Sequence, residues 1–116
     1  MNKPPDSTLT EWNRLAAEKE GWTDLKPCDT CYSGWVGKAP AESPRDFSFR
    51  AIPDYAHDLN ETHRLEMGLD DLAYQFWGDR LESLCLDYDQ PLLSTPAWVR
   101  LRAWLEVKGV EVKDAE

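Results

Sequence analysis

The chain has 116 residues, 41% of them hydrophobic, and a formal net charge of −9. This length suffices for one domain whose core needs neither disulfides nor metal. The chain has three cysteines, and an odd number is more typical of a protein in a reducing compartment than of a disulfide scaffold. The sequence has neither the apolar segment of a signal peptide nor an apolar run long enough for a membrane span. It therefore predicts a single domain in the cytoplasm.

The excess negative charge is concentrated in the middle third of the chain. Residues 1–53 carry 8 acids and 7 bases, residues 54–91 carry 10 acids and 2 bases, and residues 92–116 carry 4 of each. This distribution argues against a main surface that binds nucleic-acid phosphates or anionic lipid directly. It permits a basic protein partner or imitation of a nucleic acid. The simpler alternative is a solvated helix face that only keeps the protein soluble.

A flexible leader is predicted for residues 1–7, and a first helix from Leu9 to Glu20. Thr8 and Glu11 form a capping-box pattern at its start, and Gly21 can end it. Its predicted inner face contains Leu9, Trp12, Leu15 and Ala16.

Residues 22–46 are rich in glycine and proline, which predicts a loop with one short strand at Tyr32–Val36. The alternating segment Phe47–Ile52 is the clearest strand candidate. Asp54 is the predicted N-cap of a second helix, which Gly68 weakens or ends. The predicted apolar stripe of this helix contains Tyr55, Leu59, His63 and Met67.

A third helix is predicted from Asp70 to about Leu86, and a fourth begins with Thr95 as N-cap and ends at Gly109. Val110 and Val112 could add a last strand. The stripe of the third helix contains Leu69, Leu72, Ala73, Phe76, Trp77, Leu81, Leu84, Cys85 and Tyr88. The covered side of the fourth contains Trp98, Leu101, Trp104, Leu105 and Lys108.

These elements predict a helix-rich α+β fold with a small sheet of two to four strands packed by helices, as in an α/β/α sandwich. The globular domain is expected at residues 8–113, with a tail at 114–116. Residues predicted to share one core are Leu59, His63, Phe76, Leu81, Leu101 and Leu105.

Cys28 and Cys31 are separated by two residues, a spacing that lets two thiolates face one zinc ion. A tetrahedral site needs two further ligands, and only Cys85, His57 and His63 offer soft donors. A single pair is a weak signal, so we expect no cofactor and no zinc, with a small zinc-binding module as an alternative. A redox dithiol is disfavoured because a proline-bounded loop, not a strand-to-helix junction, surrounds the pair.

No catalytic arrangement stands out. His57 and His63 lie about 240° apart around a helix and do not converge, and His63 is predicted to be a core histidine. Carboxylates are so abundant that some pair always looks suitable for acid–base chemistry. We therefore predict that the protein is not an enzyme.

The aromatic residues of the 22–36 loop, Trp22, Tyr32 and Trp35, could stack on a base or anchor a partner. The alternative is that they cover the helices. A binder that sequesters a nucleotide-like molecule would need these rings beside Arg45, Arg50 or Arg64.

Several motifs resemble the phage ABA-sandwich-domain family of small phage and prophage proteins. They are Glu20-Gly21-Trp22 after the first helix, Pro53-Asp54-Tyr55, Asp58-Leu59-Asn60, the segment from His63 to Leu69, and the capped helix from Thr95 to Gly109. The resemblance implies a helix–sheet–helix sandwich and a viral accessory gene, and it carries no catalytic residues.

The leading functional prediction is a phage or prophage accessory protein that binds a host or defence-system protein with a basic patch in the bacterial cytoplasm. The candidate binding residues are Asp58, Glu61, Asp79 and Glu82 of the acidic block, and Tyr32 and Trp35 of the loop.

Overall fold

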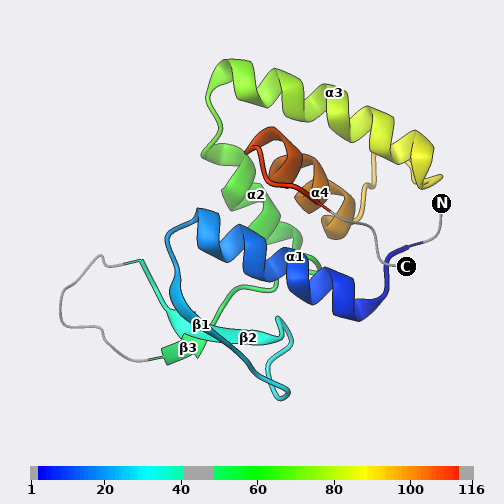
Figure 1. Ribbon diagram of the computed structural model, residues 1–116. Coiled ribbons are helices and arrows are strands. Elements are labelled where there is room, and N and C mark those ends of the chain that lie inside the picture. The colour runs from blue at the N-terminus through cyan, green and yellow to red at the C-terminus, as the bar shows by residue number, and fades with distance from the viewer. Residues whose placement is uncertain (1–2, 41–48, 113–116) are drawn as a thin grey trace.

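The computed structural model describes residues 3–40 and 49–112 and contains four helices and a three-stranded sheet in this part of the chain (Figure 1). The sheet is antiparallel, with the strands in the order β1-β2-β3. This confirms the predicted α+β class. In chain order the elements are α1 (Asp6–Lys19), β1 (Thr23–Pro27), β2 (Trp35–Lys38), β3 (Phe49–Ala51), α2 (Leu59–Met67), α3 (Asp71–Asp87) and α4 (Ala97–Val107).

The last helix, α4, is the centre of the core. It packs against α1, α2 and α3, and Figure 1 shows it between α3 and α1. Contact on several sides explains why Leu101 and Leu105 are fully buried and why even Arg102 is covered. Because only one side of a surface helix is normally apolar, a helix covered this completely must be central. No helix of the described residues is long and apolar enough to cross a membrane.

The sheet packs on α1 through β2, and the helices gather on that side of it (Figure 1). Every described residue of β3 is exposed, as are four of the five in β1. The described residues therefore place no second helical layer over the sheet, unlike the predicted α/β/α sandwich. The β1 strand is also irregular, with a register shift between Thr23 and Lys26 and a positive φ of 53° at Asp24.

The strands differ from their predicted positions. β1 occupies a segment for which the sequence predicts a loop. The prediction missed this strand because the segment is mostly polar and most of its side chains are exposed. β2 begins at Trp35, three residues after the predicted start at Tyr32. β3 lies within the predicted Phe47–Ile52 strand, of which Phe47 and Ser48 fall outside the described residues. Residues 110–112 form no strand, so the prediction for Val110 and Val112 is wrong.

The starts of α1 and α4 differ from their predicted positions. α1 begins at Asp6, inside the predicted leader 1–7, so Thr8 lies within the helix and forms no capping box. Pro5 precedes it without a side-chain cap. Gly21, with φ of 97°, follows the end of α1 as predicted. At α4 the N-cap is Pro96, while the Thr95 hydroxyl donates to the carbonyl oxygens of Leu92 and Pro91.

The second helix starts later than predicted, and this changes its buried face. Asp58, not Asp54, is the N-cap of α2, and its carboxylate accepts a hydrogen bond from the Asn60 amide at 2.9 Å. Residues 54–57 form a separate turn. The buried residues of α2 are Thr62, Leu65 and Glu66. The predicted stripe residues Leu59, His63 and Met67 are exposed, so their assignment to the core or apolar face is wrong.

The third helix has nearly its predicted bounds, with Asp70 as N-cap accepting from the Ala73 amide at 2.7 Å. The apolar stripe predicted for this helix was too wide, because Leu72 and Phe76 are exposed. The assignment of Phe76 to the core is therefore wrong. Lys108, the C-cap of α4, is exposed as well. The residues of the predicted core set that are buried are Leu81, Leu101 and Leu105.

Candidate functional site

The four predicted acidic binding residues lie on two helices. Asp58 caps α2, and Glu61 forms an ion pair with Arg64 at 3.4 Å in the same helix. Asp79 and Glu82 are exposed on α3. The first two therefore have local structural roles, whereas the second two lie on a different surface.

That surface is the outer face of α3, defined here by Leu72, Phe76, Asp79, Glu82 and Leu86. At 100° per residue these five positions fall within an arc of about 120°, opposite the buried side of the helix. The apolar members have exposed fractions of 63%, 58% and 79% for Leu72, Phe76 and Leu86. An exposed helix face thus combines large apolar side chains with carboxylates.

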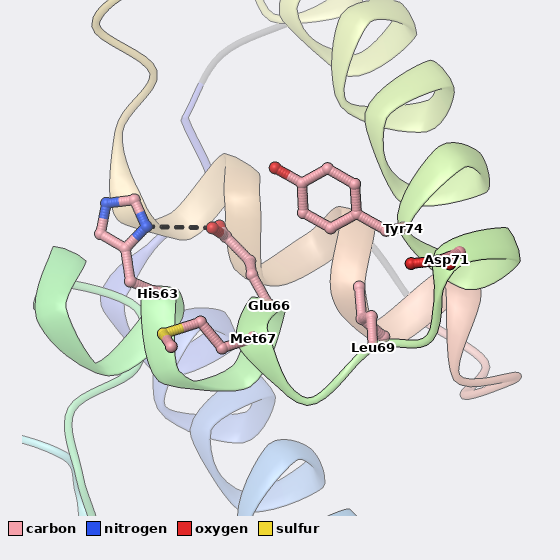
Figure 2. A pocket seen from close by; sticks show the side chains of 6 residues that line it. All are labelled: His63, Glu66, Met67, Leu69, Asp71 and Tyr74. Carbon is pink, nitrogen blue, oxygen red and sulfur yellow. Dashed lines mark hydrogen bonds and ion pairs between the residues drawn. The ribbon is translucent and has the colours of Figure 1, made fainter.

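A pocket lies where α2 turns into α3, with a volume of about 420 Å³. Figure 2 shows its lining side chains around one common space, two of them in the first turn of α3. Met67 is strongly exposed at its rim. The pocket is lined by His63, Glu66, Met67, Leu69, Asp71 and Tyr74. We call it the α2–α3 pocket.

One carboxylate of this pocket, that of Glu66, is buried and forms an ion pair with the partly buried Arg100. Arg100 donates from Nε to Glu66 Oε1 at 2.7 Å and from Nη2 to Oε2 at 3.0 Å. The His63 ring lies 3.1 Å from the same Oε2, and the Arg100 guanidinium lies over the Trp77 ring. A buried carboxylate is tolerated when it is paired in this way. Glu66 thus links α2 to α4, and the prediction of His63 as a core residue is replaced by an exposed His63 beside it.

The sequence does not distinguish Glu66 from the other acids of the middle segment, because none of its neighbours in the sequence marks it as buried or paired. Its partner Arg100 lies 34 residues further along the chain. Asp71 at the other side of the pocket differs, because it forms no ion pair with any residue in the ranges 3–40 and 49–112. The pocket therefore retains one carboxylate for an incoming cation.

The two loop aromatics have different positions. Tyr32 is 94% exposed. Trp35 packs against the core, its Nε1–H donates to the Thr10 carbonyl at 3.0 Å, and the Arg14 guanidinium covers its ring. The structure thus leaves Tyr32 on the surface and uses Trp35 to hold β2 on α1.

The three arginines considered for the alternative nucleotide site belong to different parts of the chain. Arg64 lies on α2 beside Glu61, Arg50 lies in β3, and Arg45 falls outside the described residues. Of these, Arg50 lies beside the 22–36 segment, because β3 pairs with β2 and Arg50 stands opposite Gly37.

The cysteine pair is close in space. Cys28 and Cys31 are half-buried, and their Sγ atoms are 2.7 Å apart. Cys85 is buried and contacts the Thr95 hydroxyl at 3.5 Å. His57 is exposed as predicted, with its Nδ1 3.0 Å from the Asp54 carboxylate. Within the described part of the chain, no three His, Cys, Asp or Glu side chains are grouped to hold a metal ion.

The two thiols of the pair are chemically unequal. Hydrogen bonds from the Cys31 and Thr30 side chains lower the pKa of Cys28. The same Cys31–Cys28 hydrogen bond raises the pKa of Cys31, because that proton is held between the two sulfur atoms.

Comparison of the chain with protein-family models, curated proteins and solved structures finds no match.

Proposed function

We propose that this protein is a non-enzymatic binding protein that docks a basic partner protein through the outer face of α3 and the α2–α3 pocket. The observation that carries the proposal is that Leu72, Phe76 and Leu86 share an exposed helix face with Asp79 and Glu82. Apolar side chains gathered on a surface mark interaction sites. Carboxylates among them favour a partner whose apolar anchors are flanked by Lys or Arg.

The α2–α3 pocket supports this proposal because its chemistry suits a basic side chain. Leu69 and Met67 offer apolar surface to the methylene stem of a Lys or Arg. Tyr74 offers an aromatic ring, and Asp71 a carboxylate, to the charged end. Glu66 is already engaged by Arg100, so Asp71 is the group that would pair with the partner.

The biological setting in this proposal is a phage or prophage accessory protein that binds a host or defence component. Its support is the resemblance carried by Pro53-Asp54-Tyr55, Asp58-Leu59-Asn60 and the helix that ends near Gly109. Binding rather than catalysis is proposed because no spacing in the sequence singles out a catalytic set.

The test uses a synthetic amphipathic helix with leucine on one face and lysine on the other as the probe. Fluorescence titration of the full-length protein measures its Kd at about 0.1 M and about 1 M salt, where the Debye length falls from about 10 Å to about 3 Å. We expect weaker binding at the higher salt concentration. The triple variant Asp71→Asn, Asp79→Asn, Glu82→Gln should weaken binding about tenfold, since each exposed charge contributes about 0.2–1 kcal/mol.

A charge-matched control removes three exposed acids elsewhere, through Glu20→Gln, Asp24→Asn and Glu111→Gln. This variant should retain most of the affinity. If the two triple variants bind equally weakly, only the net charge matters and the acidic block serves solubility. A double variant Leu72→Ser, Phe76→Ser tests the apolar part, and its unchanged Kd would contradict docking on α3.

A further inference from the structure

The inference concerns the turn between β1 and β2, which holds Cys28 and Cys31. The turn is closed by two backbone hydrogen bonds, from the Cys28 amide to the Gly34 carbonyl at 2.9 Å and from the Gly34 amide to the Cys31 carbonyl at 3.0 Å. The two Sγ atoms lie 2.7 Å apart. A disulfide requires an S–S distance of about 2.0 Å, so a small side-chain rotation would bring the sulfur atoms into bonding distance.

The body of the domain holds this turn in place. The Asn13 side chain in α1 donates to the Ser33 carbonyl at 3.2 Å. Gly34 has a φ of 87° and lies so close to Thr10 that a Cβ there would meet the Thr10 Cβ at 2.8 Å. The cysteines therefore lie on a turn anchored to α1, where both residues are partly exposed.

The number of available metal ligands near Cys28 and Cys31 favours redox chemistry of this pair over a structural metal site. A closed zinc site needs four ligands, and no group of three or more candidate ligands occurs in the described ranges. Two thiols held side by side can form an intramolecular disulfide by exchange, and the lowered pKa of Cys28 favours it as the attacking thiolate.

We propose that Cys28 and Cys31 form a redox-active dithiol that a low-molecular-weight disulfide, such as oxidised glutathione, converts reversibly into an intramolecular disulfide. The Cys28 thiolate attacks one sulfur of the reagent, forming a mixed disulfide and releasing one glutathione. Cys31 then loses its proton and attacks the Cys28 sulfur, which releases the second glutathione. The two protein thiols are oxidised, the reagent disulfide is reduced to two thiols, and the two cysteine protons pass to them.

The proposal is tested on the full-length protein in mixtures of reduced and oxidised glutathione, with acid quenching and intact-mass analysis. The wild-type protein should lose two hydrogens as the oxidised fraction rises and regain them with excess reduced glutathione. Cys31→Ser should accumulate a mixed disulfide on Cys28. Cys28→Ser should stop at a mixed disulfide on Cys31, because it lacks the second thiol that would resolve it. Cys85→Ala, which removes the buried cysteine, should cycle as wild type does.

Circular dichroism establishes that each variant is folded before its thiol chemistry is measured. The proposal is overturned if the wild-type pair stays reduced in excess oxidised glutathione and Cys31→Ser forms no mixed disulfide. It is also overturned if the purified protein contains one zinc per chain that protects both thiols and is lost in the Cys28→Ser, Cys31→Ser double variant. These outcomes are independent of the peptide titration, because the dithiol lies outside the proposed docking surface.

Discussion

At the scale of single residues, Asn13 connects three parts of the fold. Its side chain is fully buried, and its amide donates to the Ser33 carbonyl and to the Asp54 carboxylate. Its oxygen accepts from the Ala56 amide at 2.8 Å. One asparagine in α1 thus holds both the β1–β2 turn and the turn before α2. Buried polar groups satisfied in this way make a core specific, and they are costly to leave without partners.

We expect Asn13→Ala to lower the free energy of unfolding by about 2–4 kcal/mol, because a buried backbone amide and carbonyl would lose their partner. Urea denaturation measures this change. Asn60→Ala, an exposed asparagine in α2, is the matched control and should stay within about 0.5 kcal/mol of wild type. Equal stability of the two variants would contradict the connecting role of Asn13.

At the scale of elements, α4 is the helix on which the others depend. Leu101 is fully buried within it, in the core between α4 and its neighbours. We expect Leu101→Ala to cost about 2–5 kcal/mol, as buried large-to-small changes do. Thermal unfolding checks this, with Leu72→Ala on the outer face of α3 as the control. An unchanged melting temperature for Leu101→Ala would refute the central position of α4.

Helix α3 and the end of α4 were predictable because local signals agree with their packing. Asp70 is a strong N-cap, and Gly109 ends α4 with a positive φ of 79°. The start of α2 was missed because Asp54 and Asp58 are equally good caps by sequence. Asp54 is instead engaged by Asn13, 41 residues away. Long-range contacts of this kind leave no local pattern.

The candidate site was predictable only in part, for the same reason. The exposed position of Asp79 and Glu82 followed from the helical period. The exposure of Phe76 could not be predicted. Periodicity shows which side of a helix is apolar, but it does not show how much of that side a neighbouring element covers. The proximity of Cys28 and Cys31 was implied by their spacing, whereas their placement in a turn anchored to α1 required the fold.

At the scale of the whole molecule, the charge distribution sets the response to salt. Residues 54–91 carry 10 acids and 2 bases, and salt screens the partly buried Glu66–Arg100 pair less than it screens exposed charges. Repulsion among the exposed acids of this segment therefore outweighs the attraction between its acidic and basic side chains. We expect the melting temperature to rise by a few degrees between about 0.01 M and 0.15 M salt, the shift that about 0.5–1 kcal/mol produces in a domain of this size.

Calorimetry in a chloride salt series measures this rise. The variant Asp71→Asn, Asp79→Asn, Glu82→Gln should show a smaller rise than wild type, because it removes part of the repulsion. A melting temperature that falls with salt would mean that surface ion pairs dominate instead.

The irregular strand β1 has a consequence for how copies of this protein meet in concentrated solution. An edge strand offers a row of backbone N–H and C=O groups that another chain can extend into a larger sheet. In β1 the shifted register around Asp24 interrupts this row, and Pro27 has no N–H to offer. β1 pairs with β2 on one side and is a poor template for a further strand on the other. This edge of the sheet is therefore protected against aggregation.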